Sequence, residues 1–267
     1  MNDQRDHRYR ELLVTPIRAC STYLPKMGGD ENINFDLFSS MYGSDPFYHW
    51  VGLDTAPMFA AHKAAGGMTS VYRQLGIGSE RLFREILKDE LGLSALEVVW
   101  SYTQVVAPKD GEAPKTKTLT LDGRVDLENI TDSTKRERFR QWIEDQKALL
   151  KITIPLKGAV FEVRQGYKSA DSKRQNGDIL NATQALGHGY LPVLVIMSTQ
   201  INRAVFERYL VNNWAVLRGH SSADALSGTF DFLRDVVGYD LPAFFERQSV
   251  GIRSEVEVIL KKLLEAA

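Results

Sequence analysis

The stretch that decides the fold runs from Val160 to Asp178 and reads VFEVRQGYKSADSKRQNGD. Apolar and charged side chains alternate at its start, which predicts a short β-strand with Glu162 and Arg164 on one face. A polar turn follows, and a helix is predicted from residue 173 onward. A strand that carries charge toward a sheet and a helix that opens with basic residues both work against local preference. Two such violations close together in the sequence indicate a functional site.

The charged pair on this strand suits phosphate chemistry. Because Glu162 and Arg164 are two residues apart, they project together while Phe161 and Val163 point to the other face. The carboxylate can hold a divalent metal ion, and the cation can stabilise a pentacovalent phosphorus or the attacking water. A structural ion pair between strands is the alternative interpretation.

A magnesium site needs a second acidic ligand, since Mg²⁺ in proteins usually takes one or two carboxylates and completes its shell with water and phosphate oxygens. Residues 117–126 alternate with period two, which predicts a strand that carries Asp122 and Asp126 on one face. Asp122 is the first candidate ligand and Asp126 the second. Glu80 could add a ligand or orient water. It follows Ser79, a candidate N-cap, so a first-turn glutamate favoured by the helix dipole is the alternative.

The predicted helix begins like a segment that binds anions or base edges. Ser172 and Gln175 fit the N-cap and N3 positions of a capping box, whereas Lys173 and Arg174 each cost about 0.3–1 kcal/mol against the helix dipole if exposed. A bound anion would reverse that cost, and Lys168 in the preceding turn would complete a phosphate clamp. Side chains of this kind also read base edges in the major groove. The residues expected to contact DNA are Lys168, Ser169, Asp171, Ser172, Lys173, Arg174, Gln175 and Asn176.

The chain around this stretch alternates between predicted strands and helices. An amphipathic helix is predicted over residues 133–151, and the alternation continues after the stretch with a helix over 173–186, a strand over 191–197, a helix over 202–212 and a strand over 214–217. This alternation predicts an α/β fold with a mixed central sheet flanked by helices.

The N-terminal part gives weaker signals. We expect a helix over residues 8–20, then a loop rich in Gly, Asn and Asp up to about residue 60, whose aromatic side chains pack the loop down. Without an internal repeat or a linker, we predict a single domain over residues 1–267. Its parts would be a helical and loop region (1–97), the core (98–237) and the C-terminal helices (238–267).

Composition excludes several classes of protein. The chain is 43% hydrophobic and 25% charged, which is typical of a globular protein, and its net charge of −1 means that any nucleic-acid binding depends on local patches. Cys20 is the only cysteine, so an intramolecular disulfide and a cysteine-rich zinc site are excluded. The polar start and the absence of a long apolar run predict neither a signal peptide nor a membrane span. We therefore expect a cytoplasmic protein.

The segments Glu162-Val-Arg164, Lys168-Ser169 and Asp171–Asn176 resemble the type II restriction endonucleases of the PD-(D/E)xK superfamily. The likeness covers roughly residues 118–218 and is strongest to members in which a short polar segment and a DNA-reading helix follow the catalytic strand. It implies a PD-(D/E)xK core and a hydrolase that cuts both strands of double-stranded DNA at a short palindromic site. It also implies Mg²⁺ as cofactor, a homodimer, and a cognate DNA methyltransferase in the same system.

By the same resemblance, Asp122 stands for the first catalytic acid, Glu162 for the second and Arg164 for the basic member. Two departures matter. Arginine occupies the usual lysine position and cannot give up a proton, which makes Lys168 a second candidate for the catalytic cation. Asp122 also precedes Glu162 by a long segment, and some relatives use a helix-borne acid, which would make Asp178 an alternative to Glu162.

Two other functions fit the residues. One is a structure-specific repair or junction nuclease of the same fold, and the other is a catalytically inert DNA-binding protein, which the arginine at position 164 favours. For the homodimer, residues 246–264 are one candidate interface.

Overall fold

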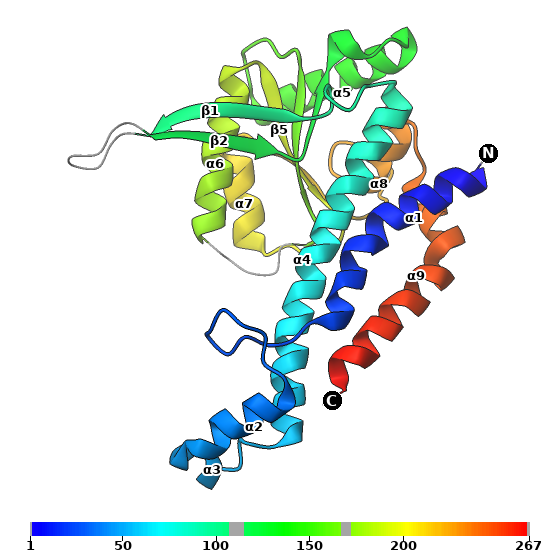
Figure 1. Ribbon diagram of the computed structural model, residues 1–267. Helices are drawn as coiled ribbons and strands as arrows, with labels where there is room; N and C mark the ends of the chain where they lie inside the picture. The colour runs from blue at the N-terminus through cyan, green and yellow to red at the C-terminus, as the bar shows by residue number, and fades with distance from the viewer. Residues whose placement is uncertain (1, 107–114, 167–171, 266–267) are drawn as a thin grey trace. The chain divides into compact units, whose positions relative to one another are not determined.

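A computed structural model describes residues 2–106, 115–166 and 172–265 (Figure 1). Backbone contacts divide the chain into two compact units, one of Met1–Gly78 with Phe245–Ala267 and the other of Ser79–Phe244. Two helices, α4 (Ala56–Leu91) and α9 (Leu241–Leu264), contribute residues to both units. The single domain predicted for residues 1–267 stays a prediction.

The second unit is built on a four-stranded sheet in the order β3-β4-β5-β6. Strand β3 runs antiparallel to β4, whereas β4, β5 and β6 are parallel to one another. Their bounds are Gly123–Asp126 for β3, Gly158–Arg164 for β4, Tyr190–Ile196 for β5 and Ala215–Leu217 for β6. A separate antiparallel pair consists of β1 (Trp100–Val106) and β2 (Lys115–Leu121).

Helices cover both faces of the four-stranded sheet (Figure 1). On one face, α6 (Ser172–Gly187) and α7 (Arg203–Val211) pack against Val160 and Leu194. On the other, fully buried Phe161 contacts the ring of Phe83 from α4 and the ring of Phe232. Burial of one such phenylalanine contributes about 1.5–3 kcal/mol. The α/β class and the mixed sheet flanked by helices are confirmed.

The helices behind Phe232 complete the second face. Phe139 and Trp142 of α5 contact its ring, and the N-cap Asp132 accepts hydrogen bonds from two backbone N–H groups at the start of α5. The bounds are Ser133–Leu150 for α5, Thr229–Asp231 for α8 and Phe232–Val237 for the π-helical turn that follows α8.

The strand predicted over residues 117–126 is wrong in one respect. It is broken at Asp122: β2 ends at Leu121 and pairs with β1, whereas β3 begins at Gly123 and pairs with β4. Period-two alternation continues across the break, so the pattern alone did not show that the chain changes sheets there.

The first unit is helical. It contains α1 (Asn2–Arg18), a short 3-10 turn (Ala19–Thr22), α2 (Phe35–Ser44), α3 (Pro46–Trp50), the first part of α4 and most of α9. An ion pair joins α1 to α9, because the Arg18 Nε lies 2.6 Å from a carboxylate oxygen of Glu255. Among the described helices, none is long and apolar enough to cross a membrane.

The loop expected before residue 60 is also corrected, because most of residues 35–50 is helical. The polar residues that suggested a loop are helix caps: Asn34 accepts a hydrogen bond from Leu37 N–H at the start of α2, and Asp45 accepts from two N–H groups of α3. Of the aromatic side chains expected to pack down, Phe38 is fully buried, but Trp50 is 80% exposed.

Candidate active site

The candidate site lies at the carboxyl end of the central strand β4. Glu162 and Arg164 project from the same face, as alternation predicts, and the Arg164 Nη1 forms a close ion pair with the Glu162 carboxylate. Glu162 is only 6% exposed. This carboxylate is therefore held inside the protein by a neighbouring cation.

Asp122 reaches the same place from the break between β2 and β3. Its Oδ2 accepts a hydrogen bond of 2.7 Å from the Val163 backbone N–H and lies 3.9 Å from Arg164 Nη1. Arg84 of α4 fixes the backbone here, because its Nε donates a 2.7 Å hydrogen bond to the Asp122 carbonyl oxygen. Asp122 and Glu162, which are far apart in sequence, therefore meet at one guanidinium nitrogen.

A third carboxylate comes from α6. Asp178 is 5% exposed, and its Oδ1 lies 3.6 Å from Arg164 Nη2. Its Oδ2 accepts a hydrogen bond from the Tyr209 hydroxyl of α7. Tyr209 was not predicted, since only the packing of α7 against α6 places its hydroxyl there. Arg164 thus lies between three carboxylates from separate segments of the chain, those of Asp122, Glu162 and Asp178, which we call the acidic cluster.

Glu80 lies at the edge of this cluster. It pairs with Arg84 one helical turn away. The prediction that Ser79 caps a helix is wrong, because α4 runs without interruption from Ala56 to Leu91. The helix α4 also approaches α1 closely at Gly78, where a Cβ would lie 2.3 Å from the Leu13 carbonyl oxygen. Glu80 therefore sits within α4, away from the favourable end of its dipole.

Electrostatics at the site favour protonated acids in the absence of another cation. Burial raises the pKa of Glu162 well above its ordinary value; Arg164 opposes this, and the charges of Asp122, Asp178 and Glu80 add to it. Burial also raises the pKa of Asp122 to about 6, with a further contribution from Glu80, and the Val163 N–H opposes it. For Arg164, burial lowers the pKa, but the surrounding carboxylates outweigh burial and raise it. Arg164 therefore stays charged.

Asp126, the second candidate ligand, is not brought to this cluster. It pairs with Gly158 at the start of β4, about 13 Å along the strand from the level of Glu162. Its Oδ1 accepts a 2.7 Å hydrogen bond from the Tyr190 hydroxyl, and its Oδ2 lies 3.2 Å from Arg124 Nε. These contacts indicate a structural role for Asp126, in place of a role as a metal ligand.

The residues predicted to contact DNA lie in or next to the start of α6. Lys168, Ser169 and Asp171 lie outside the described residues, and of Ser172, Lys173, Arg174, Gln175 and Asn176 only the helical backbone is described. The helix α6 does begin at Ser172 and carries Asp178, so the segment leads directly into the acidic cluster.

The donor set suits a hard divalent cation. Asp122 and Glu162 offer oxygen ligands, which Mg²⁺ prefers, and Mg²⁺ commonly takes only one or two carboxylates from a protein. Within the described ranges, no group of three or more His, Cys, Asp or Glu side chains is arranged to hold a metal ion. Two observations nevertheless favour a ligand at this place: the acids repel one another, and the buried Arg164 Nε has no hydrogen-bond partner among the described residues.

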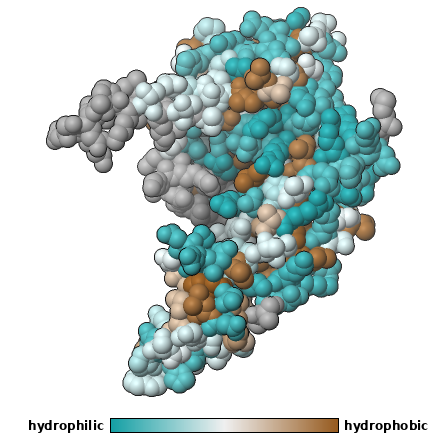
Figure 2. All heavy atoms as spheres, viewed as in Figure 1, coloured by the Kyte–Doolittle hydropathy of each residue, from teal (hydrophilic) through white to brown (hydrophobic). Residues whose placement is uncertain are grey.

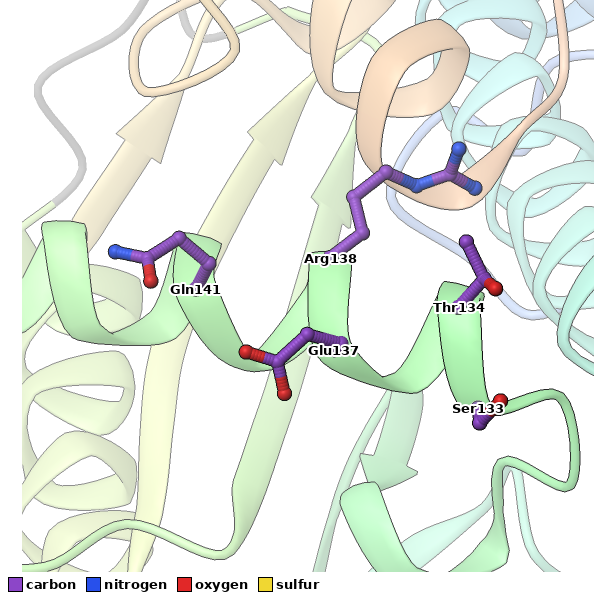
Figure 3. Close-up of a pocket in the computed structure, with 5 residues that line it drawn as sticks. All are labelled: Ser133, Thr134, Glu137, Arg138 and Gln141. Atoms are coloured by element: carbon purple, nitrogen blue, oxygen red, sulfur yellow. The ribbon is translucent and has the colours of Figure 1, made fainter.

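A pocket of about 540 Å³ lies elsewhere, on α5 (Figure 3). Its lining residues are Ser133, Thr134, Glu137, Arg138 and Gln141, and none of them belongs to the acidic cluster. Arg138 points away from α5 in Figure 3, and its Nε donates a 2.9 Å hydrogen bond to the Val236 carbonyl oxygen. This pocket lacks paired carboxylates and carries no part of the proposed chemistry.

The raised pKa of Asp122 predicts a stability change in Asp122→Asn. The folded chain holds this proton more tightly than the unfolded chain, so the free energy of unfolding falls as the pH rises from about 4 through the folded-state pKa of about 6. Asparagine removes the charge and keeps an acceptor for Val163 N–H. We expect urea denaturation at pH 8 to show a gain of about 1–3 kcal/mol that disappears toward pH 4.

Asp145→Asn is the matched control, because Asp145 is exposed on α5. It should change the free energy of unfolding by less than about 0.5 kcal/mol at either pH. An Asp122→Asn variant that is less stable than the wild type at pH 8 would mean that the carboxylate stabilises the fold.

Comparisons with known proteins identify no relative: no family model, no curated protein and no solved structure matches this chain.

Proposed function

We propose that this chain is a Mg²⁺-dependent, sequence-specific double-strand DNA endonuclease of the type II restriction class. One observation carries the proposal: Asp122 and Glu162, from separate segments, meet at the Nη1 of Arg164 at the end of the central strand. The PD-(D/E)xK resemblance requires one acid at the end of a strand, and a second acid on the neighbouring strand followed two residues later by a cation; Asp122, Glu162 and Arg164 fill these positions.

The order of the elements supports the same proposal. A strand antiparallel to β4 leads from the first acid, and β4 then connects through α6 to the parallel strand β5. The resemblance implies this order: a catalytic strand, a DNA-reading helix and the next core strand. A PD-(D/E)xK core is therefore part of the proposal.

In the proposed mechanism, Asp122 and Glu162 would hold the metal ion. When bound, Mg²⁺ would polarise the phosphodiester and lower the pKa of water. Glu162 is buried at the end of β4, so its carboxylate could orient a water molecule and accept a proton from it. Asp178, held by the Tyr209 hydroxyl, would keep Arg164 in place from the opposite side.

Arg164 serves as a permanent cation in this mechanism. Arginine keeps its proton at the pH of catalysis, so Arg164 would stabilise negative charge that develops on the phosphate. A phosphate oxygen could accept a hydrogen bond from its Nε. Lys168 remains the second candidate for this role.

Digestion of DNA tests the function. We expect the purified chain to cut phage DNA into discrete fragments in about 10 mM Mg²⁺ and not in EDTA. In the absence of DNA, the same Mg²⁺ should raise the Tm of the wild type by about 3 °C and leave that of Asp122→Asn unchanged, because binding to the folded state alone stabilises it. Intact DNA on diverse templates in both Mg²⁺ and Mn²⁺ would count against the proposal.

The same digestion separates the two alternatives. A repair or junction nuclease would cut damaged or branched DNA without a fixed sequence. A catalytically inert DNA-binding protein would bind without cutting, and the ion pair that Arg164 already makes with Glu162 favours this candidate over the first. A restriction enzyme would also need a cognate methyltransferase in the same cell, so a methyltransferase gene beside this one would support the leading proposal.

A further inference from the structure

The helices α2 and α3 of the first unit carry an exposed hydrophobic surface. Many of the exposed large hydrophobic side chains among the described residues fall between positions 37 and 51. Figure 2 shows brown, hydrophobic atoms just above the lower tip of the view, and the tip itself is white to teal. We call this set the aromatic surface; its members are Leu37 (47% exposed), Met41 (42%), Phe47 (63%), Tyr48 (38%), Trp50 (80%) and Val51 (52%).

The aromatic surface rests on an ordered base. Phe38 of α2 is fully buried and its ring lies 5.4 Å from that of Phe59 in α4. Tyr42 stacks on Phe38 on one side and on Tyr48 of α3 on the other, with centroids 4.3 Å and 4.9 Å apart. The exposed side chains are therefore presented by packed helices, which lowers the entropy cost of binding a partner.

Charge in this region argues against a phosphate-bearing partner. No Lys or Arg occurs between positions 27 and 62, so nucleic acid and anionic membranes find no cation here. Two of the charged residues next to the aromatic surface have local partners: Asp45 caps α3, and His49 Nδ1 lies 2.7 Å from Asp54 Oδ2. Asp36 of α2 is exposed. The partner is therefore a protein with an apolar surface of its own.

The exposed area matches the core of a dimer interface. With roughly 200 Å² for each large side chain, the exposed fractions amount to about 600 Å² per copy. A monomer's largest apolar patch reaches about 300–600 Å² and is often functional. A standard interface buries about 800 Å² per partner, of which the apolar core is a part and the polar rim the remainder.

We propose that the aromatic surface binds the same surface of a second copy of this chain across a two-fold axis. The six side chains of the aromatic surface are uncharged, so two copies can bury them against each other without pairing like charges between these side chains, as an isologous interface requires. The choice of a second copy rests in part on the proposed function, since cutting both strands of a palindromic site needs two acidic clusters. The interface lies in α2 and α3, and not in residues 246–264.

Sedimentation velocity of the full chain tests this without DNA or metal. The wild type should be a dimer at about 10 µM. The double variant Phe47→Ser/Trp50→Ser should dimerise at least about 30-fold more weakly, because exposed aromatic anchors dominate such interfaces. Far-UV circular dichroism and Tm would verify that the variant is folded, since both side chains are mostly exposed. The matched control is Val250→Ser/Val258→Ser on α9, where the side chains are 80% and 51% exposed, and it should remain a dimer.

Three outcomes would overturn the proposal: a wild type that stays monomeric up to about 50 µM, a monomeric α9 control beside a dimeric Phe47/Trp50 variant, or association that continues beyond the dimer. Because mass is the readout, failure of DNA cleavage alone would leave this proposal intact. A cleaving protein that is monomeric would overturn the interface and leave the proposed function.

Discussion

Glu162→Gln should abolish DNA cleavage, with a loss of at least about 10³-fold in rate, while DNA binding is unchanged or tighter. Glutamine has nearly the same shape and can still accept a hydrogen bond from Arg164, so the packing of β4 should be preserved. It cannot, however, provide a charged oxygen to a divalent cation or accept a proton from water. Removal of one negative charge also reduces the repulsion of DNA phosphates.

Cleavage of plasmid DNA and a gel-shift titration in Ca²⁺-free EDTA buffer would measure the two quantities separately. Glu137→Gln is the matched control, because Glu137 is exposed on α5 and pairs only with Arg140 among the described residues. It should cut at the wild-type rate. Retained cleavage in Glu162→Gln would remove Glu162 from the mechanism and make Asp178 the acid to test next.

Much of the second unit could be predicted from sequence patterns, because its strands are short apolar stretches that can be recognised without knowledge of the fold. Strand β5 was predicted from a continuous apolar run, and all its residues are buried, as expected for a parallel strand covered on both faces. In α4, by contrast, Ser79 as a candidate N-cap suggested that a helix begins there. The helix continues because packing against α1 favours glycine at position 78, which no local propensity reveals.

The candidate site was predictable only where it is local. Alternation along β4 places Glu162 and Arg164 on one face without any knowledge of the fold. The same rule grouped Asp126 with Asp122, and it failed because the chain changes sheets at position 122. The sequence suggested Asp178 only as an alternative acid and did not suggest Tyr209. Both reach the site through the packing of α6 and α7 on the sheet, which local patterns do not reveal.

Arg164→Met should produce the largest loss of stability, about 3–5 kcal/mol at pH 8. The Arg164 side chain is 18% exposed, and its guanidinium pairs with Glu162. Methionine would leave the Glu162 carboxylate buried without this partner. The loss should shrink as the pH falls. In the variant, the pKa values of Glu162 and Asp122 rise further above their unfolded values, so the folded chain binds more protons and its free energy of unfolding increases from pH 8 toward pH 5.

Urea denaturation at pH 8 and pH 5.5 would measure this dependence, with Arg140→Met as the matched control. Arg140 is half exposed and pairs with Glu137 on the surface, so its loss should cost less than about 1 kcal/mol at both pH values. Arg164→Lys keeps the charge and should recover most of the stability. If Arg164→Met were as stable as Arg140→Met at pH 8, the three carboxylates would not depend on this guanidinium. The acidic cluster would then have to be neutralised by protons, and the role of Arg164 as the cation at the scissile phosphate would lose its support.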